Sequence, residues 1–361
     1  MRILWISHRC PNHPQAGGAE VHLREVGGRL VKMGHSVTVL AERFNGARPQ
    51  EQIDGMTILR MGGRLTLHLH VPYHLLRNQD RYDVVVDDVA HAVPFGSPRF
   101  TKKPVVGIVH HVHQQVVGVE VQPVLRQLIR WAERSIQGNY KNILAVSQTT
   151  RRDLIEQIGV EASRITVIYY GIDHERYRPG TKSDEPTILW IGRMKKYKNV
   201  DRIIEAFKTV RKSVKNARLV LAGTGDQWEE LQKMVSRENI DGVKFVGKVV
   251  GDKKIDLLQR SWCVIYASEI EGWGMGVLEA SACGTPAVAY DSGALSEAIV
   301  DQQTGLLANY GNIFELSQNL VRIIQDEPLR RRLSENALKH SFNFSWEKAA
   351  TQTAEYLESL I

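Results

Sequence analysis

Short apolar segments alternate along this chain with longer segments whose apolar residues recur at helical spacing. Residues 2–6 form the first apolar segment, and Val21, Val26 and Leu30 belong to the helical pattern that follows it until Gly34. A strand, a helix and a further strand in succession pair in parallel within one sheet, so this order predicts a doubly wound α/β fold. Further apolar segments lie at residues 36–40, 56–59, 84–86, 105–109 and 143–146.

The alternation is interrupted once and then begins again. Residues 177–186 hold two prolines, a glycine and mixed charges, a composition typical of a linker between domains. A chain of 361 residues that is 43% hydrophobic can bury two cores of ordinary size. We therefore expect two Rossmann-like domains, residues 1–176 and 187–340, with a cleft between them. The strands expected in the second domain are residues 187–191, 217–222, 244–246 and 263–266, and the helices between them are residues 200–210, 228–237 and 253–259.

The loop at residues 268–280 is the most informative part of the sequence. In parallel sheets, ligands bind beyond the carboxyl ends of the strands, where this loop is expected to lie. Its glycines allow the backbone to approach a ligand closely, and the free amides of residues 275–277, at the start of a predicted helix, can bind phosphate oxygens. The other loops expected at such strand ends follow Ile6, Val109, Ile191 and Ala222.

Two glutamates flank this predicted anion site. Glu271 precedes it and Glu279 lies one turn inside the helix, so both could accept hydrogen bonds from hydroxyl groups on either side of a bound pyrophosphate. The alternative is that both are solvated helix-end charges and that the glycines only form a tight turn. The functional interpretation is favoured because a basic segment, residues 192–199, follows the first strand of the second domain. There Arg193 offers a rigid fork and Lys198 a point charge for phosphate.

Two other classes of site are disfavoured by the sequence. Three histidines, His110, His111 and His113, follow an apolar segment as in some metal sites, but no cluster of carboxylates follows them, so we expect no metal ion. Gly17 and Gly18 lie between a strand and a helix, where a ligand can pass close to backbone amides. They do not form the Gly-x-Gly-x-x-Gly fingerprint, which argues against a dehydrogenase.

Net charge and cysteine content limit which binding partners and which cellular compartment suit this chain. The formal charge of +7 suits nucleic acid, anionic lipid or a phosphorylated substrate, because each presents dense negative charge. No RNA-binding aromatic signature, zinc finger or heptad-bearing basic region is visible, so we expect no nucleic-acid partner. Cys10, Cys263 and Cys283 are widely separated, and the first residues lack the long apolar region of a secretory signal, so we expect a cytoplasmic protein.

These motifs together resemble those of the retaining GT-B glycosyltransferases of glycosyltransferase family 4. The resemblance covers essentially the whole chain, and it is carried by Gly17-Gly18-Ala19-Glu20, by Gly192-Arg193 with Lys198, and by Glu271 and Glu279 separated by seven residues. It implies a nucleotide-diphosphate sugar as the donor substrate, no divalent metal and no further cofactor. It also implies that the two domains face each other across a cleft and that residues 341–361 form a helix that crosses back to the first domain.

The resemblance assigns donor-binding roles in the second domain. It implies that Arg193 and Lys198 bind the donor diphosphate. Glu271 then contacts the donor sugar and Glu279 holds the ribose. The other donor contacts are Gly17, Gly18, Gly192, Gly272, Trp273, Gly274, Met275, Gly276 and Val277. The sequence departs from the family at Ala267, where proline is common, and at Trp273, where phenylalanine is common, and both departures concern donor details rather than activity.

In the first domain the resemblance places His110 close to the transferring sugar. His111, His113 and Ser147 are candidates for the acceptor side or for structural roles. The acceptor itself is expected to be a glycan, a lipid-linked molecule or a small molecule, and the donor a UDP- or GDP-hexose.

Retention of the sugar configuration implies a front-face substitution. No Asp or Glu is placed as a covalent nucleophile, because Glu271 is expected at the sugar hydroxyls. The departing phosphate then takes the proton of the acceptor while Arg193, Lys198 and the helix amides stabilise its charge. Two alternatives stay open, a catalytically silent nucleotide-sugar-binding partner subunit and a GT-B sugar-nucleotide epimerase.

One segment of the first domain could rest on a membrane. Around residues 124–136, Arg126, Arg130 and Arg134 recur every fourth residue beside apolar residues, which suits either an anionic membrane surface or ordinary packing of the apolar face on the sheet. Residues 95–103 allow the same two interpretations. We therefore expect a cytoplasmic protein, with peripheral association at the inner face of the membrane as one alternative.

Overall fold

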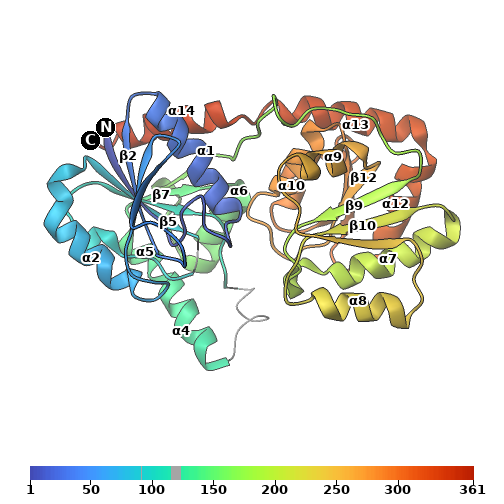
Figure 1. Cartoon of the computed structure of the whole chain (residues 1–361), viewed down its shortest axis with the longest axis horizontal. Helices are drawn as coiled ribbons and strands as arrows, with labels where there is room; N and C mark the ends of the chain where they lie inside the picture. Colours follow the sequence, from blue (N-terminus) through green and yellow to red (C-terminus); the bar gives the residue numbers. More distant parts are fainter. Residues whose placement is uncertain (91, 115–122) are drawn as a thin grey trace. The chain divides into compact units, whose positions relative to one another are not determined.

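The computed structural model describes residues 1–90, 92–114 and 123–361, which form two compact units. The first unit contains Met1–Gly171 together with Trp346–Ile361, and the second contains Ile172–Ser345. Each unit is built on one sheet with helices packed against it (Figure 1). The predicted linker, residues 177–186, lies inside the second unit.

An eight-stranded sheet forms the centre of the first unit, in the order β3-β4-β2-β1-β5-β6-β7-β8. Neighbouring strands are parallel except for β3 and β4, which are antiparallel at one edge. The strands are β1 (Arg2–Ile6), β2 (Ser36–Ala41), β3 (Gln50–Ile53), β4 (Met56–Arg60), β5 (Val84–Val89), β6 (Val105–Val109), β7 (Asn142–Ala145) and β8 (Ile165–Val167). The prediction of a doubly wound parallel sheet is confirmed, while β3 and β8 were not predicted.

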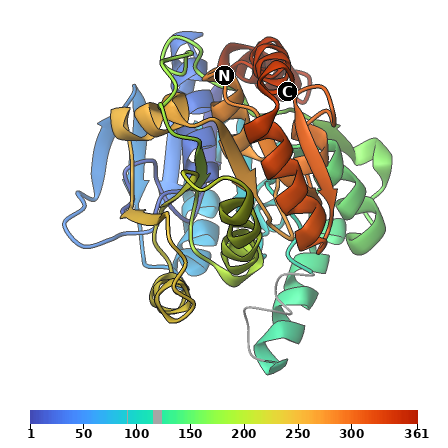
Figure 2. The same cartoon turned by 90° about the vertical axis from the view of Figure 1, so that its right-hand side faces the viewer.

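Helices cover the first sheet because its strands are apolar on both faces. Leu4 and Ile6 of β1 belong to one core with Leu67 and Val71 of α2, whereas the alternating residue Trp5 points to the opposite face and contacts His22 of α1. Figures 1 and 2 show α4 extending away from this sheet. The helices are α1 (Gly18–Lys32), α2 (Leu67–Asn78), α4 (Pro123–Arg134), α5 (Ile136–Asn139), α6 (Gln148–Asp153), which continues as a π-helical turn (Leu154–Ile158), and α14 (Trp346–Glu358).

The second unit has a six-stranded sheet in the order β11-β10-β9-β12-β13-β14, and all its pairs are parallel. The strands are β9 (Thr187–Ile191), β10 (Arg218–Ala222), β11 (Val243–Gly247), β12 (Cys263–Tyr266), β13 (Ala287–Asp291) and β14 (Gly305–Asn309). The helices are α7 (Val200–Ser213), α8 (Trp228–Arg237), α9 (Asp252–Arg260), α10 (Met275–Ala282), α11 (Leu295–Ala298), α12 (Ile313–Gln325) and α13 (Glu327–Ser341). Trp190 and Phe207 are fully buried in its core.

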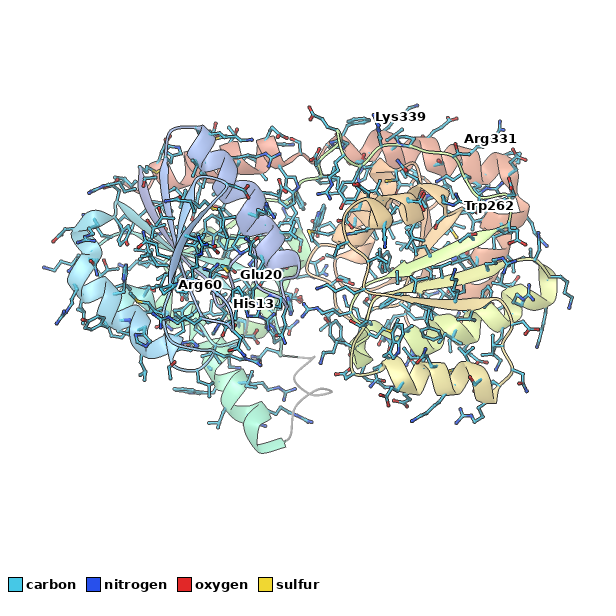
Figure 3. The ribbon with its side chains drawn as sticks, in the orientation of Figure 1. His13, Glu20, Arg60, Trp262, Arg331 and Lys339 are labelled. Carbon is cyan, nitrogen blue, oxygen red and sulfur yellow. The ribbon has the colours of Figure 1, made fainter. Side chains whose placement is uncertain are left out.

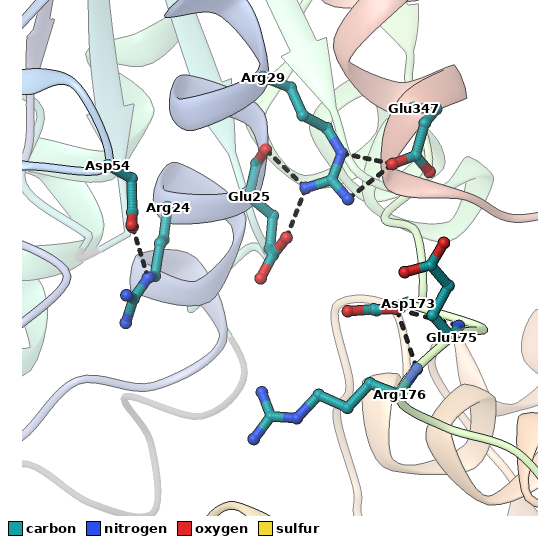
Figure 4. Close-up of polar contacts among 8 residues, drawn as sticks. All are labelled: Arg24, Glu25, Arg29, Asp54, Asp173, Glu175, Arg176 and Glu347. Carbon is teal, nitrogen blue, oxygen red and sulfur yellow. Dashed lines mark hydrogen bonds and ion pairs between the residues drawn. The ribbon is translucent and has the colours of Figure 1, made fainter. Parts of the chain in front are cut away.

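The last helix completes the first unit. Arg29 of α1 forms an ion pair with Glu347 of α14 at 2.7 Å and another with Glu25 of its own helix at 2.5 Å (Figure 4). Trp346 packs on Tyr170 with ring centres 5.8 Å apart. The predicted return of the C-terminal helix to the first unit is therefore confirmed.

The chain enters and leaves the second unit at neighbouring points. Ile172, its first residue, forms a parallel bridge with Ser345, its last. Next to this bridge Asp173 accepts hydrogen bonds at 3.1 Å from the backbone amides of Glu175 and Arg176, which closes a local turn (Figure 4). These bonds fix the start of the second unit.

Lys182 of the second unit is half-buried and lies close enough to Arg330 for that cation to oppose its charge. Lys182 donates a hydrogen bond to Thr285, and burial lowers the pKa of its ammonium group to about 8. Burial also raises the pKa of the Cys263 and Cys283 thiols to about 12, so neither thiol supplies a negative charge at neutral pH. Charging Lys182 therefore opposes folding.

We expect replacement of Lys182 by methionine to raise the melting temperature at pH 7. The folded-state pKa of about 8 lies below the ordinary value of 10.5, so the unfolded chain binds more protons between these values and the stability of the native protein rises with pH there. The advantage of Lys182→Met over the native protein should therefore be largest below pH 8 and shrink towards pH 10. Calorimetry across this range measures it, with the exposed Lys215→Met as control. A lower melting temperature for Lys182→Met throughout would contradict this account.

Candidate active site

Four loops of the second unit meet at one edge of its sheet. Because β9, β10, β12 and β13 are parallel neighbours, the segments that follow them emerge at the same carboxyl edge. Backbone hydrogen bonds join these segments: Met194 N–H donates to Thr224 O at 2.9 Å, and Glu269 N–H donates to Tyr197 O at 2.8 Å. A third bond runs from Ala294 N–H to Glu271 O at 3.1 Å. The predicted loops after Ile191, Ala222 and Tyr266 are therefore joined to one another and to the segment after β13.

The loop after β10 packs directly against the basic segment after β9. Gly223 has a φ of +143°, and a Cβ atom there would lie 1.7 Å from the carbonyl oxygen of Gly192. At Gly225 a Cβ atom would lie 2.2 Å from the carbonyl oxygen of Met194. Both positions therefore require glycine. The sequence analysis named the loop after Ala222 as a place where a ligand could bind but none of its residues, although its two glycines were a usable signal.

The structure brings Lys198 and Glu271 together. Lys198 Nζ donates to Glu271 Oε1 at 2.5 Å, and Ser268 Oγ donates to the same oxygen at 2.9 Å. Burial is the largest single effect and would lower the pKa of the Lys198 ammonium group, but the charge of Glu271, its hydrogen bond and the nearby Tyr197 together raise the net pKa. Arg193 is exposed and lies close enough for its charge to oppose this rise. Lys198 therefore remains a cation beside the glycine-rich loop.

Glu279 is held by two residues that the sequence analysis did not identify. Its Oε1 atom accepts hydrogen bonds from Lys254 Nζ of α9 at 2.5 Å and from the Tyr177 hydroxyl at 3.1 Å. Only 8% of Glu279 is exposed, so it is not a solvated helix-end charge. Both bonds use Oε1, which leaves Oε2 for another donor. Lys254 and Tyr177 are distant from Glu279 in sequence, and no local pattern marks them.

The glycine-rich loop leads into α10 through a left-handed residue. Gly274, the residue before the helix, has a φ of +84°. A Cβ atom at Gly276 would lie 2.1 Å from the Tyr266 hydroxyl oxygen, so glycine is required there as well. Trp273, predicted as a donor contact, is buried and packs on Phe344 with ring centres 5.0 Å apart. The Trp273 ring is therefore turned into the protein, and donor contacts of Gly272, Met275 and Val277 stay predictions.

In the first unit, both ring nitrogens of His110 lie within hydrogen-bond distance of a partner. Its Nε2 lies 2.6 Å from Asp88 Oδ1, and its Nδ1 lies within hydrogen-bond distance of the Tyr170 hydroxyl. Burial, together with the charges of Asp88 and Glu20, raises the pKa of Tyr170 well above its ordinary value, so its hydroxyl keeps its proton. This arrangement gives Nε2–H donating to Asp88 and Tyr170 O–H donating to Nδ1. A direct contact between the His110 ring and a sugar stays a prediction, and it requires one of these bonds to open.

An aromatic layer supports this histidine. His22 stacks on Tyr170 with ring centres 4.7 Å apart, and Trp346 of α14 lies 6.2 Å from His22. Burial and the nearby His110 lower the pKa of His22 to about 3, so His22 is neutral at physiological pH. The last helix therefore supports the position of His110 through side chains of the same unit.

The backbone of Gly17 donates a hydrogen bond to a carboxylate of the first unit. Its backbone N–H donates to Glu20 Oε2 at 2.6 Å, and Glu20 is buried in α1 (Figure 3). Burial raises the pKa of Glu20, and the bond from Gly17 opposes this rise. Gly18 is the first residue of α1. Both glycines therefore lie at the start of this helix, as predicted from the sequence.

The other predicted residues of the first unit make structural bonds. His113 pairs with Glu133 of α4 through its ring at 3.0 Å and its backbone N–H at 2.6 Å, and its ring lies 4.0 Å from that of His111. Ser147 accepts a hydrogen bond from Thr150 N–H at 2.9 Å and caps α6. Within residues 1–90, 92–114 and 123–361, no group of three or more His, Cys, Asp or Glu is arranged to hold a metal ion.

Comparison with known protein families matches nearly the whole chain. Residues 16–176 match the family described as Glycosyltransferase Family 4, and residues 172–340 match the family described as Glycosyl transferases group 1. These matches correspond to the two parallel-sheet units.

Individual relatives and solved structures are similar to the chain. An uncharacterized glycosyltransferase of Methanocaldococcus jannaschii is 30% identical over 238 residues, which are 63% of this chain and 65% of that protein. A GDP-mannose-dependent alpha-(1-6)-phosphatidylinositol monomannoside mannosyltransferase of Mycobacterium tuberculosis is 24% identical, over 99% of this chain and 98% of that one. The crystal structure of Anabaena HepE in complex with UDP-glucose matches with a TM-score of 0.81 and 19% identity, over all of both chains.

The solved structure shows the same fold, and the two family matches together span residues 16–340. The chain therefore belongs to the family 4-like glycosyltransferases with the GT-B fold.

Proposed function

We propose that this protein transfers a hexose from a nucleotide-diphosphate sugar to an acceptor hydroxyl, with retention of configuration and without a divalent metal. The observation that carries the proposal is the set of groups beside the start of α10 in the second unit. There the start of α10, Lys198 and Arg193 gather positive charge beside the glycine-rich loop. A helix N-terminus with adjacent cations binds phosphate well, because backbone N–H groups and positive charge point to the same place.

The paired charges favour a front-face substitution. Glu271 Oε1 already accepts from Lys198 and Ser268, an arrangement that suits a charge partner better than a covalent nucleophile. In the proposed step the bond from the anomeric carbon to the diphosphate oxygen breaks as the bond to the acceptor oxygen forms on the same face. The acceptor proton passes to the departing phosphate oxygen, and Lys198 and Arg193 stabilise its charge.

For the donor nucleotide and the acceptor, the proposal names chemical classes rather than single compounds. One relative is named for its dependence on GDP-mannose, and the similar Anabaena structure holds UDP-glucose, so UDP- and GDP-hexoses are the first candidates. The acceptor is a glycan, a lipid-linked molecule or a small molecule. Glu279 is the proposed ribose ligand, because its Oε2 atom is the one that neither Lys254 nor Tyr177 contacts.

Binding of nucleoside diphosphates tests the donor site. We expect UDP or GDP to raise the melting temperature in the presence of EDTA, because a ligand that binds only the native state stabilises it. Lys198→Met should weaken that binding by about tenfold or more, since it removes a charge-assisted bond to phosphate. The exposed neighbour Lys196→Met is the matched control and should bind normally. No shift with any nucleotide, or equal binding by Lys198→Met, would contradict the assignment.

Because Lys254 and Tyr177 hold Glu279 in place, we expect recognition of the ribose to depend on Lys254. Lys254→Met should weaken binding of the ribonucleoside diphosphate by about tenfold, because Glu279 loses the cation that orients it, while 2′,3′-dideoxy analogues should bind as before. Lys253→Met, on the same helix and exposed, should leave both affinities unchanged. Titration calorimetry measures these affinities. Retained preference for the ribose form in Lys254→Met would show that Lys254 does not orient Glu279.

Retention and metal independence have their own test. With a donor identified by the binding screen, NMR of the fresh product should show the anomeric configuration of the donor. The initial rate should be unchanged by EDTA. An inverted product, or activity that EDTA removes and Mg²⁺ or Mn²⁺ restores, would contradict the proposed mechanism.

A further inference from the structure

Helix α2 is apolar on two opposite faces. Leu67, Val71 and Leu75 point into the core of the first unit. On the other side, Leu69, Tyr73 and Leu76 follow the helical spacing of four and three residues and are 73%, 51% and 63% exposed. Leu65, just before the helix, is 83% exposed. Packing on the sheet needs only one apolar face, so the second face requires another explanation.

This outer face, Leu65, Leu69, Tyr73 and Leu76, differs from ordinary exposed apolar residues. Single exposed apolar side chains are common and need no function. Three of them on one face of α2, with Leu65 just before the helix, form an exposed apolar strip, and such strips in soluble proteins mark sites of interaction. We refer to these four residues as the α2 strip.

Basic side chains border the α2 strip. Arg64 stands before the helix, and Arg77 lies over the Tyr73 ring with its guanidinium carbon 4.6 Å from the ring centre. Lys102 belongs to a loop fastened to the end of α2, because its backbone N–H donates to Gln79 Oε1 at 3.3 Å. The exposed basic residues of this region are Arg64, Arg77, Arg81 and Lys102, and the exposed acidic residue is Asp80. The border is therefore positively charged.

We propose that the α2 strip docks on the surface of an anionic lipid bilayer. The leucines enter the boundary between headgroups and acyl chains, Tyr73 lies at the headgroup level, and the basic border contacts lipid phosphates. No helix of the described ranges is long and apolar enough to span a membrane. This inference does not depend on the proposed transfer reaction.

The segments predicted from the sequence fit this role less well. Phe95 is buried and packs in the core. Within residues 95–103, the part suited to contact lipid is therefore the basic end at Lys102 and Lys103. From Arg126 onward, where the side chains of α4 are described, the exposed large apolar residues are Leu128 and Trp131. Arg130 donates a hydrogen bond to the carbonyl oxygen of Gln114 at 3.0 Å. The segment before α4, residues 115–122, lies outside the described residues. The α2 strip has more exposed apolar residues than the described side chains of α4, and the positions of its basic border are all described.

A second copy of the chain is a poorer occupant. In a symmetric dimer the same patch meets itself, so the basic borders of two α2 strips would face each other. Like charges placed in this way repel, whereas an anionic bilayer complements them. Charge therefore selects the lipid surface over a second protomer.

Vesicle flotation of the full chain tests the proposal. We expect binding to vesicles of phosphatidylcholine mixed with phosphatidylglycerol and little binding to phosphatidylcholine alone. The double variants Leu69→Ser with Leu76→Ser and Arg77→Glu with Lys102→Glu should each reduce binding by about tenfold or more. Phe314→Ser removes a 71% exposed aromatic ring of α12 in the second unit and is the matched control. Melting temperatures near that of the native protein show that each variant is folded.

Several results would overturn the proposal. Equal binding to neutral and anionic vesicles removes the role of the basic border, and unchanged binding by the leucine variant removes the role of the α2 strip. Loss of binding in Trp131→Ser, with both α2 variants unaffected, moves the lipid contact to α4. Light scattering that finds a dimer in the native protein and a monomer in the leucine variant assigns the strip to a second copy instead.

Discussion

Parallel pairing of β9 with β10 and β12 is the constraint on which the candidate site depends. It directs three loops to the same edge of the sheet, and Gly223 and Gly225 let two of them pack backbone against backbone. Lys198 and Glu271 are 73 residues apart in sequence but meet at 2.5 Å for this reason. With an antiparallel pair in this position, one of these loops would lie at the opposite edge, and the charged groups would not converge.

Two cations of the site are paired with glutamates of the same unit. The half-buried Glu271 pairs with Lys198 and the buried Glu279 pairs with Lys254, so each carboxylate has a cation beside it. In the first unit Asp88 is fully buried and accepts from His110 and, at 3.4 Å, from the Trp5 indole. Such pairing keeps ionised groups inside a protein at an acceptable cost, because unpaired buried charges strongly oppose folding. The geometry of each carboxylate is thereby fixed before any substrate binds.

The sequence predicted what depends on local pattern. Strands β9 and β12 have the predicted bounds, and the glycine-rich loop precedes α10 as expected, because apolar runs and helix-start signals lie within a few residues. The hydrogen bonds from Lys254 and Tyr177 to Glu279 could not be predicted. They join three segments that are distant in sequence, and the directions of their side chains depend on tertiary packing. The same holds for Asp88, which reads in the sequence as an interruption of an apolar strand. Strand β3 is largely polar and was missed because it lies at a sheet edge, where one face is not buried.

The two units differ in whether one continuous stretch of the chain is enough to form them. The second unit is a single continuous stretch, whereas the first is completed by Trp346, which packs against Tyr170 and His22 beneath His110. A ribosome makes the chain from the N-terminus, so the sheet of the first unit is synthesised early but waits for the last helix. During synthesis the second unit can therefore finish folding before the first one does. The histidine beside the proposed reaction centre gains its full support only when α14 has left the exit tunnel.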